Sequence, residues 1–245
     1  MKAGGPLSRI RVVLSRPSHP GNIGAAARAM KTMGLARLYL VRPRKFPDPE
    51  ARAMATGAVD VLGSAQVCTD LDAALEGTSF SVAMSARSRE LSHPPLAARA
   101  AAQELVRAAQ RDEVALVFGN ETVGLSNEEV MRCGRIARIP SDSVYKSLNL
   151  AQAVQVMAYE VRMAALDPCA AAPRIEYATH EEIENFYAHL ERSLYASGFL
   201  HPGNPRKLMD RLRRLFAKAR LEKVEVNILR GMLAAWDDRG HPGNS

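Results

Sequence analysis

Three polar segments of the sequence each begin where a short apolar run ends, and each leads into a predicted helix. They combine amide, hydroxyl, carboxylate and guanidinium groups, which can bind and orient a polar ligand. Ligands of open parallel sheets bind at the loops that leave the carboxyl ends of the strands. The three segments are SRPSHPGNIGAAARAMKTMGL (15–35), FGNETVGLSNEEV (118–130) and YKSLN (145–149).

In the first segment, an asparagine and an arginine are the candidate functional residues. Pro20 and Gly21 predict a turn, and Asn22 is a favourable N-cap for the helix that follows. Three alanines would let that helix pack closely. Arg28 follows them as a single charge in this alanine-rich segment. The alternative interpretation is a capped helix with a solvated arginine.

The second segment places a carboxylate directly after a predicted strand. Gly119 permits a tight or left-handed turn, and Glu121 follows it. Glu128 and Glu129 lie in the first turn of the next predicted helix, which suits the helix dipole. This acidic start makes the segment a poor phosphate cradle, so it is not a P-loop. A plain strand–turn–helix connection is the alternative.

The third segment starts the long helix predicted for residues 149–166. Ser147 and Asn149 stand on either side of Leu148, and one of the two could serve only as an N-cap. Three polar loops of this kind in one chain favour a common site over three independent helix caps.

The elements that would position these loops alternate along the first two thirds of the chain. Apolar strands separated by helices indicate an α/β fold with a parallel sheet covered on both faces. The predicted strands are 10–14, 37–41, 80–84, 114–118 and 136–140. The predicted helices of this part are Ile23–Met33, Leu71–Leu75, Leu96–Arg111, Asn127–Met131 and 149–166.

A second, helical part follows a stretch without periodicity. DPCAAAPR (167–174) contains two prolines and is typical of a linker. Beyond it the pattern predicts three helices and no strands, at 180–197, 205–219 and 223–238. We therefore expect an α/β domain over 1–166, a linker over 167–178 and a helical extension over 179–245.

Composition narrows the class of protein. The formal net charge of +7 is common in proteins that bind nucleic acid, whereas only 5% aromatic residues argue against a single-strand stacking surface. No apolar run approaches the roughly 20 residues of a membrane span, and the N-terminus lacks the apolar run of a signal peptide. The histidines show no metal-ligand spacing. Three separated cysteines, Cys68, Cys133 and Cys169, suggest a reduced, cytoplasmic environment.

Taken together, the three segments resemble the three motifs of the SPOUT-class RNA 2′-O-methyltransferases. The motifs read GNIGAAAR (21–28), FGNETVGL (118–125) and SLNLAQAV (147–154). The chain resembles the TrmJ family more closely, because the likeness extends over nearly its whole length. Further matching pieces are SARSR (85–89), FYAHLE (186–191), RLRRLF (211–216) and VNILRG (226–231).

The resemblance implies an α/β-knot domain with a C-terminal trefoil knot, a homodimer, and S-adenosylmethionine as cofactor. It implies methylation of the ribose 2′-hydroxyl of nucleotide 32, a cytidine or uridine, in the tRNA anticodon loop. Carried over by motif, the catalytic group would be Asn22, Arg28, Glu121, Ser147 and Asn149. The cofactor contacts would be Met84, Ser85, Ala86, Gly119, Ile139, Lys146, Ser147 and Leu148.

Two positions depart from the family pattern, and the helical extension adds a further expectation. Asn120 stands where several relatives have arginine, and Lys146 stands where a small residue is common. In the helix 205–219, six basic residues surround an apolar stripe and could contact tRNA phosphates or form a solvated face. They are Arg206, Lys207, Arg211, Arg213, Arg214 and Lys218.

Three other functions compete with this interpretation. A SPOUT methyltransferase acting on ribosomal RNA or on another tRNA position would share the three motifs but has less need of the helical extension. A non-catalytic RNA-binding factor would have no reason to keep the five catalytic candidates together. A nucleotide-binding dehydrogenase is disfavoured because no G-x-G-x-x-G follows the first strand.

Overall fold

The computed structural model describes residues 5–86, 94–142, 147–167, 175–201 and 207–239. The chain divides into two compact units, Met1–Ala172 and Pro173–Ser245, and each is described by itself. The boundaries predicted at residues 166 and 179 stay a prediction.

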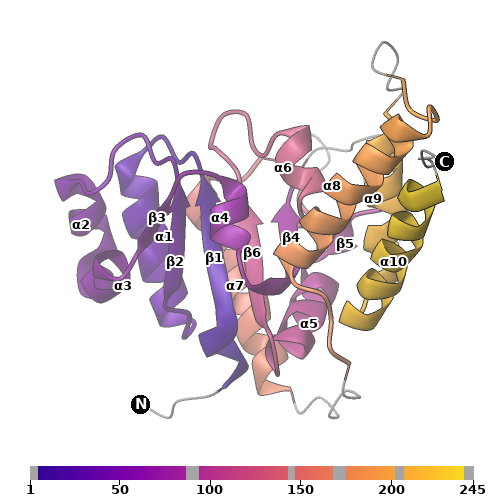
Figure 1. Cartoon of the computed structure of the whole chain (residues 1–245). Helices are drawn as coiled ribbons and strands as arrows, with labels where there is room; N and C mark the ends of the chain where they lie inside the picture. Colours follow the sequence, from indigo (N-terminus) through magenta and orange to yellow (C-terminus); the bar gives the residue numbers. More distant parts are fainter. Residues whose placement is uncertain (1–4, 87–93, 143–146, 168–174, 202–206, 240–245) are drawn as a thin grey trace. The chain divides into compact units, whose positions relative to one another are not determined.

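The first unit is built on a seven-stranded sheet in which every paired neighbour is parallel, in the order β3-β2-β1-β6-β4-β7-β5 (Figure 1). The predicted parallel sheet is confirmed, and it gains two short strands, β3 and β5, that the sequence pattern did not reveal. The strands are β1 Ile10–Ser15, β2 Arg37–Val41, β3 Gln66–Cys68, β4 Thr78–Met84, β5 Leu96–Ala97, β6 Glu113–Phe118 and β7 Arg135–Arg138.

Helices cover both faces of this sheet. The described helices of the first unit are α1 Pro20–Thr32, α2 Pro49–Ala55, α3 Val59–Gly63, α4 Leu71–Leu75, α5 Ala98–Ala109, α6 Asn127–Met131 and α7 Leu150–Leu166. Two short 3₁₀ helices lie at Pro6–Arg9 and Thr56–Ala58. Neither α2 nor α3 was predicted from the sequence.

Two helix starts predicted for the first unit were wrong. Helix α1 begins at Pro20 rather than at residue 23, with His19 as the N-cap residue, so the expected turn at Pro20–Gly21 is the first turn of the helix. Proline suits the first helical position because its fixed φ is already helical. Asn22 lies inside the helix and is not its cap. Helix α5 starts at Ala98, because Leu96–Ala97 pairs with β7 as strand β5.

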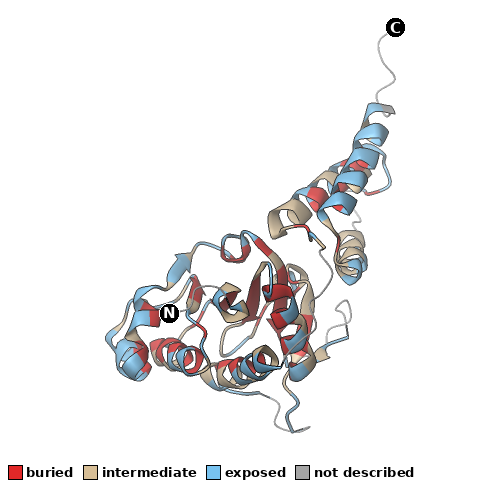
Figure 2. Cartoon of the chain, turned by 90° about the horizontal axis from the view of Figure 1, so that it is seen from below, coloured by how far each residue is buried: buried red, intermediate tan, exposed pale blue. Residues whose placement is uncertain are grey.

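The core lies on both faces of the sheet, as the buried residues of Figure 2 show. One apolar cluster joins alternate residues of β1, such as Val12 and Leu14, to the inner faces of α1, α5 and α7. The other cluster joins Val13 and residues of neighbouring strands to α4 and α6. All six residues of β1 are buried, which fits a central strand and gives the polar loops at its end a fixed base.

The second unit consists of α8 His180–Ala196, α9 Leu208–Ala219 and α10 Lys223–Arg239. Its core gathers around Phe186 and Tyr187, and the Phe186 ring meets Phe216 edge-on at 5.0 Å between centroids. Arg213 forms two hydrogen bonds to Glu184, at 2.6 and 2.8 Å, and lies 4.3 Å above the Tyr187 ring. Arg213 therefore stabilises this unit internally and is not available for phosphate contact, contrary to expectation.

Helices α1 and α2 approach each other closely at one glycine. A Cβ atom added at Gly24 would lie 2.0 Å from the Ala51 carbonyl oxygen and 3.0 Å from the Ala55 backbone nitrogen. Both contacts are to helical backbone, which cannot give way as a side-chain end can. The absence of a side chain at Gly24 thus sets the spacing of the two helices.

We expect Gly24→Ala to lower the free energy of unfolding by about 1–3 kcal/mol, because the added methyl group forces the helices apart. Gly63→Ala is the matched control, since a Cβ there meets nothing within 4 Å. Urea unfolding of the full chain measures both changes. Equal unfolding midpoints for the two variants would contradict the close approach at Gly24.

Candidate active site

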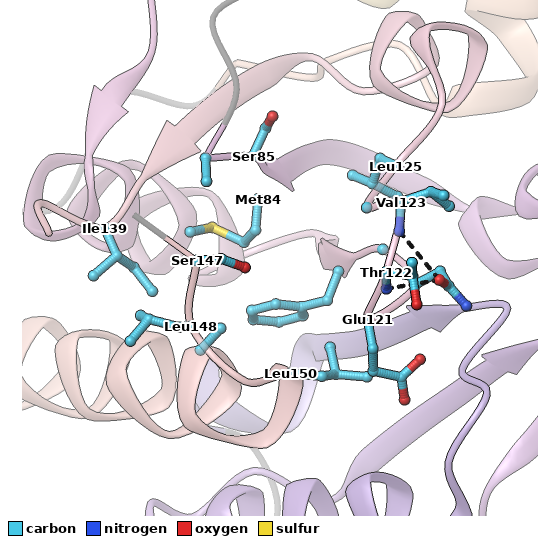
Figure 3. Close-up of a pocket in the computed structure, with 16 residues that line it drawn as sticks. Met84, Ser85, Glu121, Thr122, Val123, Leu125, Ile139, Ser147, Leu148 and Leu150 are labelled. Carbon is cyan, nitrogen blue, oxygen red and sulfur yellow. Dashed lines mark hydrogen bonds between the residues drawn. The ribbon is translucent and has the colours of Figure 1, made fainter. Parts of the chain in front are cut away.

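A cavity opens beside the carboxyl ends of β4, β6 and β7 and the start of α7 (Figure 3). The empty space in and above this open cavity, solvent included, amounts to about 810 Å³. Seven of the eight residues expected to contact a cofactor line it, although they come from four separate stretches of the sequence. They are Met84, Ser85, Ala86, Gly119, Ile139, Ser147 and Leu148. The eighth, Lys146, lies outside the described residues.

The walls of the cavity are mostly apolar. Figure 3 shows Met84, Ile139 and Leu148 on one side and Leu125 with Val123 on the other. Phe118 and Leu150 complete the wall, together with Ala153. Sequence reasoning missed Phe118, Leu125, Leu150 and Ala153, because apolar residues at strand and helix ends are indistinguishable from core residues until the fold is known.

The turn after β6 forms one rim of the cavity through two glycines. Gly124 has φ +68°, in the left-handed region, whereas Gly119, where a tight or left-handed turn was expected, does not have a positive φ. Gly119 is required for a different reason: an added Cβ would lie 2.1 Å from the Leu125 nitrogen. Asn120 holds the turn, because its Oδ1 accepts from Thr122 N at 2.9 Å and its carbonyl accepts from Gly124 N at 2.8 Å.

Glu121 joins the first and second polar segments. Its carboxylate accepts four hydrogen bonds: from Ser18 N at 2.9 Å, Ser18 Oγ at 2.7 Å, His19 N at 3.2 Å and Asn22 Nδ2 at 3.0 Å. Two of these donors are backbone amides, of Ser18 and His19, and two are side chains, of Ser18 and Asn22. The carboxylate therefore fixes the conformation of residues 18–22.

Asn149 connects the third segment to this network. Its Nδ2 donates to Asn22 Oδ1 at 2.9 Å, while its Oδ1 accepts from Ala151 N at 2.9 Å. Asn149 is the N-cap residue of α7 and also a member of the polar network, so the two alternatives considered for it hold together. Ser147 is not the cap and lines the cavity.

Hydrogen bonds also set the ionisation of Glu121. Partial burial would raise its pKa, but the bonds from the Asn22 side chain and from the backbone and hydroxyl of Ser18 outweigh burial and lower the pKa to about 2. Glu121 is therefore a carboxylate throughout the physiological range and acts as an acceptor only. A group in this state cannot take up a proton at neutral pH.

A second carboxylate, which sequence reasoning did not identify, fixes the start of the same loop. Glu129 accepts from Ser15 Oγ at 2.5 Å, from Arg16 at 2.7 Å and from Ser126 N at 2.6 Å. Burial would raise the pKa of Glu129, but these hydrogen bonds and the Arg16 charge lower it overall. Asn120 Nδ2 adds a bond to the Arg16 carbonyl at 2.8 Å. Residues 15–22 are thus held at both ends.

Arg28 does not join this network. It lies on α1, six residues after Asn22, and its side chain is exposed. Among the residues that the structure describes, no hydrogen bond or ion pair to Arg28 is found. On the helix surface it lies one turn after Ala25, whose side chain is small, and the exposed arginine is accessible to a large ligand.

Two further kinds of site were searched for. Nowhere in the described ranges do three or more histidine, cysteine, aspartate or glutamate residues gather as metal ligands. No described helix has the length and apolar character needed to cross a membrane.

Comparison with known proteins agrees with this geometry. The sequence model of the SpoU rRNA Methylase family matches residues 9–159, and that of the tRNA methyltransferase TrmJ C-terminal domain matches residues 181–244. A Klebsiella pneumoniae protein named tRNA (cytidine/uridine-2′-O-)-methyltransferase TrmJ is 50% identical over 235 residues, covering 94% of this chain and 96% of its own.

Solved structures show the same relationship. The crystal structure of TrmJ from Z. mobilis ZM4 superposes with a TM-score of 0.82 at 33% identity, covering 93% of this chain and 98% of that one. A probable methylase family protein from Haemophilus influenzae Rd KW20 gives a TM-score of 0.64 at 41% identity, covering 95% and 97%. The chain belongs to the TrmJ family of SpoU-type methyltransferases.

Proposed function

We propose that this protein transfers a methyl group from S-adenosylmethionine to the ribose 2′-hydroxyl of nucleotide 32, a cytidine or uridine, in the tRNA anticodon loop. Relatives about 50% identical over 94% of the chain carry the name tRNA (cytidine/uridine-2′-O-)-methyltransferase. The observation that carries the proposal is the hydrogen-bonded network of Glu121, Asn22 and Asn149, which joins all three motif loops beside the cavity.

The cavity fits the proposed cofactor. Its apolar wall suits an adenine ring, and backbone groups of the strand-end loops can bind the polar edge. Gly119 keeps its turn closed against Gly124 and Leu125, so no side chain intrudes there. S-adenosylmethionine supplies an electrophilic methyl group on a sulfonium. The residues that would hold it are Met84, Ser85, Ala86, Gly119, Ile139, Lys146, Ser147 and Leu148.

The chain's own residues would then position the ribose and stabilise charge. Arginine stays protonated at any physiological pH, so Arg28 serves better as an anchor for a substrate phosphate and a stabiliser of the developing alkoxide than as a base. Asn22, Asn149 and Ser147 would orient the ribose, since holding reactants in line is a large part of this catalysis. Glu121 would fix Asn22 and residues 18–19.

The helical unit is proposed to recognise tRNA. Of the six basic residues expected to face RNA on and before α9, Arg213 is paired with Glu184 and Arg206 lies outside the described residues; the remaining candidates are Lys207, Arg211, Arg214 and Lys218. RNA recognition favours single-stranded loops and overall shape, so a separate basic unit would help to select an anticodon loop. We propose the domain roles as methyl transfer over 1–166 and tRNA recognition over 179–245, in the cytoplasm, where tRNA and reduced cysteines are expected.

A homodimer is proposed through α7. This helix packs on α1 and α5 with residues such as Val154 and Val161, yet its opposite face exposes Tyr159 and Met163 with 48% and 41% of their surface accessible. Leu166, one turn further on, is 61% exposed. Apolar residues spaced four and three apart form one stripe on a helix, which is typical of an interface.

The first prediction concerns the reaction. With labelled S-adenosylmethionine and total tRNA, the wild-type protein should incorporate methyl groups at nucleotide 32, mapped by resistance to alkaline cleavage. Arg28→Ala should lower turnover by about 10²–10³-fold and weaken tRNA binding, because it removes a phosphate anchor, while cofactor binding stays near wild type. Methylation at another ribose would overturn the proposed position, and near-wild-type turnover of Arg28→Ala would remove Arg28 from catalysis.

The second prediction concerns Glu121 and pH. In the unfolded chain this carboxyl ionises near its ordinary pKa of 4.5, and in the folded chain near 2. Its contribution to stability is therefore complete above about pH 5 and declines as the pH falls towards 2. The Tm deficit of Glu121→Gln should be largest near neutral pH and narrow below pH 4.5. The exposed Glu76→Gln serves as control; a Glu121→Gln deficit that is constant with pH would contradict the network.

The third prediction concerns assembly. Met163→Arg places a charge in the middle of the exposed α7 stripe and should convert a dimer into a monomer in sedimentation equilibrium. Val67→Arg is the matched control, because Val67 is also an exposed apolar residue, on strand β3, with 59% of its surface accessible. A wild-type monomer, or a Met163→Arg dimer, would exclude the α7 interface.

A further inference from the structure

The loop that joins β2 to α2 carries an unusual concentration of positive charge. It reads RPRKFP from Arg42 to Pro47, and Arg42, Arg44 and Lys45 are all exposed. In the parts of the chain that the structure describes, the side chains of Arg44 and Lys45 have neither a hydrogen bond nor an ion pair. Arg42 is different, because its Nε donates to the Thr69 carbonyl.

Backbone hydrogen bonds fix this loop against the active-site segment. Arg44 N donates to the Pro17 carbonyl at 3.0 Å, and Arg16 N donates to the Val41 carbonyl at 2.7 Å. On the other side, Arg42 N donates to the Cys68 carbonyl at 3.1 Å. The basic loop is thus held between the end of β3 and residues 16–17.

This attachment places the two cations close to the catalytic network. Pro17 is followed directly by Ser18, whose N and Oγ both donate to the Glu121 carboxylate. Strands β1 and β2 are adjacent, with Ser15 paired to Val41, so both loops leave the same edge of the sheet (Figure 1). The loop with Arg44 and Lys45 therefore lies beside residues 16–18, which belong to the polar network.

The neighbouring carboxylates do not neutralise Arg44 and Lys45. Glu121 and Glu129 are taken up by the bonds described above, and Asp70 accepts from Ala73 N at the start of α4. Asp48 accepts from Glu50 N at the start of α2. Glu50 lies against α1, where its carboxylate would be 2.7 Å from a Cβ added at Gly21. The positive charge of the loop is thus directed to solvent.

We propose that Arg44 and Lys45 bind backbone phosphates of the substrate tRNA beside the methylated nucleotide. This inference rests on the proposed function, because it assigns a binding surface to that same site. Two uncompensated cations on a loop of fixed backbone suit the repeated charges of an RNA strand. They determine affinity and register of the RNA and take no part in the methyl transfer itself.

The test compares Arg44→Gln, Lys45→Gln and the double variant with the wild-type full chain. Both side chains are exposed and make no hydrogen bond or ion pair to any described residue, so the fold and the Arg44 N bond should be retained. Each single change should weaken tRNA binding about three- to tenfold and reduce the slope of log affinity against log salt by about 0.7–1. The KM for tRNA should rise, while kcat and the KM for S-adenosylmethionine stay unchanged.

Arg107→Gln is the matched control. Arg107 is an exposed arginine in the last turn of α5, which leads into the amino end of β6, whereas Arg44 and Lys45 follow the carboxyl end of β2. Wild-type affinity and salt slope in the double variant would overturn the proposal. An equal loss in Arg107→Gln would show non-specific attraction and would overturn it too. Binding is measured without turnover, so a wild type that binds tRNA but does not methylate it would refute the proposed function alone.

Discussion

The geometry of the site depends on one carboxylate that is hydrogen-bonded four times. Glu121 leaves the end of β6 and binds Ser18, His19 and Asn22, which follow the end of the adjacent strand β1. Burying a carboxylate, even in part, costs free energy unless its oxygens accept hydrogen bonds. The charge of Glu121 therefore keeps these donor groups in fixed positions. Asn22 then orients Asn149, and the start of α7 follows.

The rest of the fold brings these loops together at the carboxyl ends of the strands. In a parallel sheet all strand ends meet on the same side, and β1 and β6 are direct neighbours although about a hundred residues separate them in sequence. Two glycines then allow backbone approaches that no other residue permits, Gly24 between α1 and α2 and Gly119 beside Gly124. The cavity and the hydrogen-bonded network therefore depend on the strand order and on these two glycines, and not on the loop sequences alone.

The sequence predicted those features that depend on local periodicity. The apolar strands were found because burial on both faces leaves continuous apolar runs, and α7 was found because its apolar residues recur at helical spacing. Strands β3 and β5 were missed because two or three residues at a sheet edge carry no such pattern. The prediction that Asn22 caps α1 was wrong. The same amide group that makes asparagine a favourable N-cap residue can also form tertiary hydrogen bonds, and inside α1 it bonds Glu121 and Asn149. Arg213 looked like a surface cation until Glu184 was found opposite it.

The formal charge of +7 gains meaning only from the pairing of individual groups. Near the site, Glu121 and Glu129 are committed to the loop of residues 15–22, and Asp48 and Asp70 to helix starts. Their negative charge is screened by donors at close range, whereas the guanidinium of Arg28 and the side chains of Arg44 and Lys45 have no such partners among the described residues. Arg28, Arg44 and Lys45 are exposed, whereas Glu121 and Glu129 are hydrogen-bonded within the loop of residues 15–22, so these three cations can attract a polyanion without disturbing the polar network.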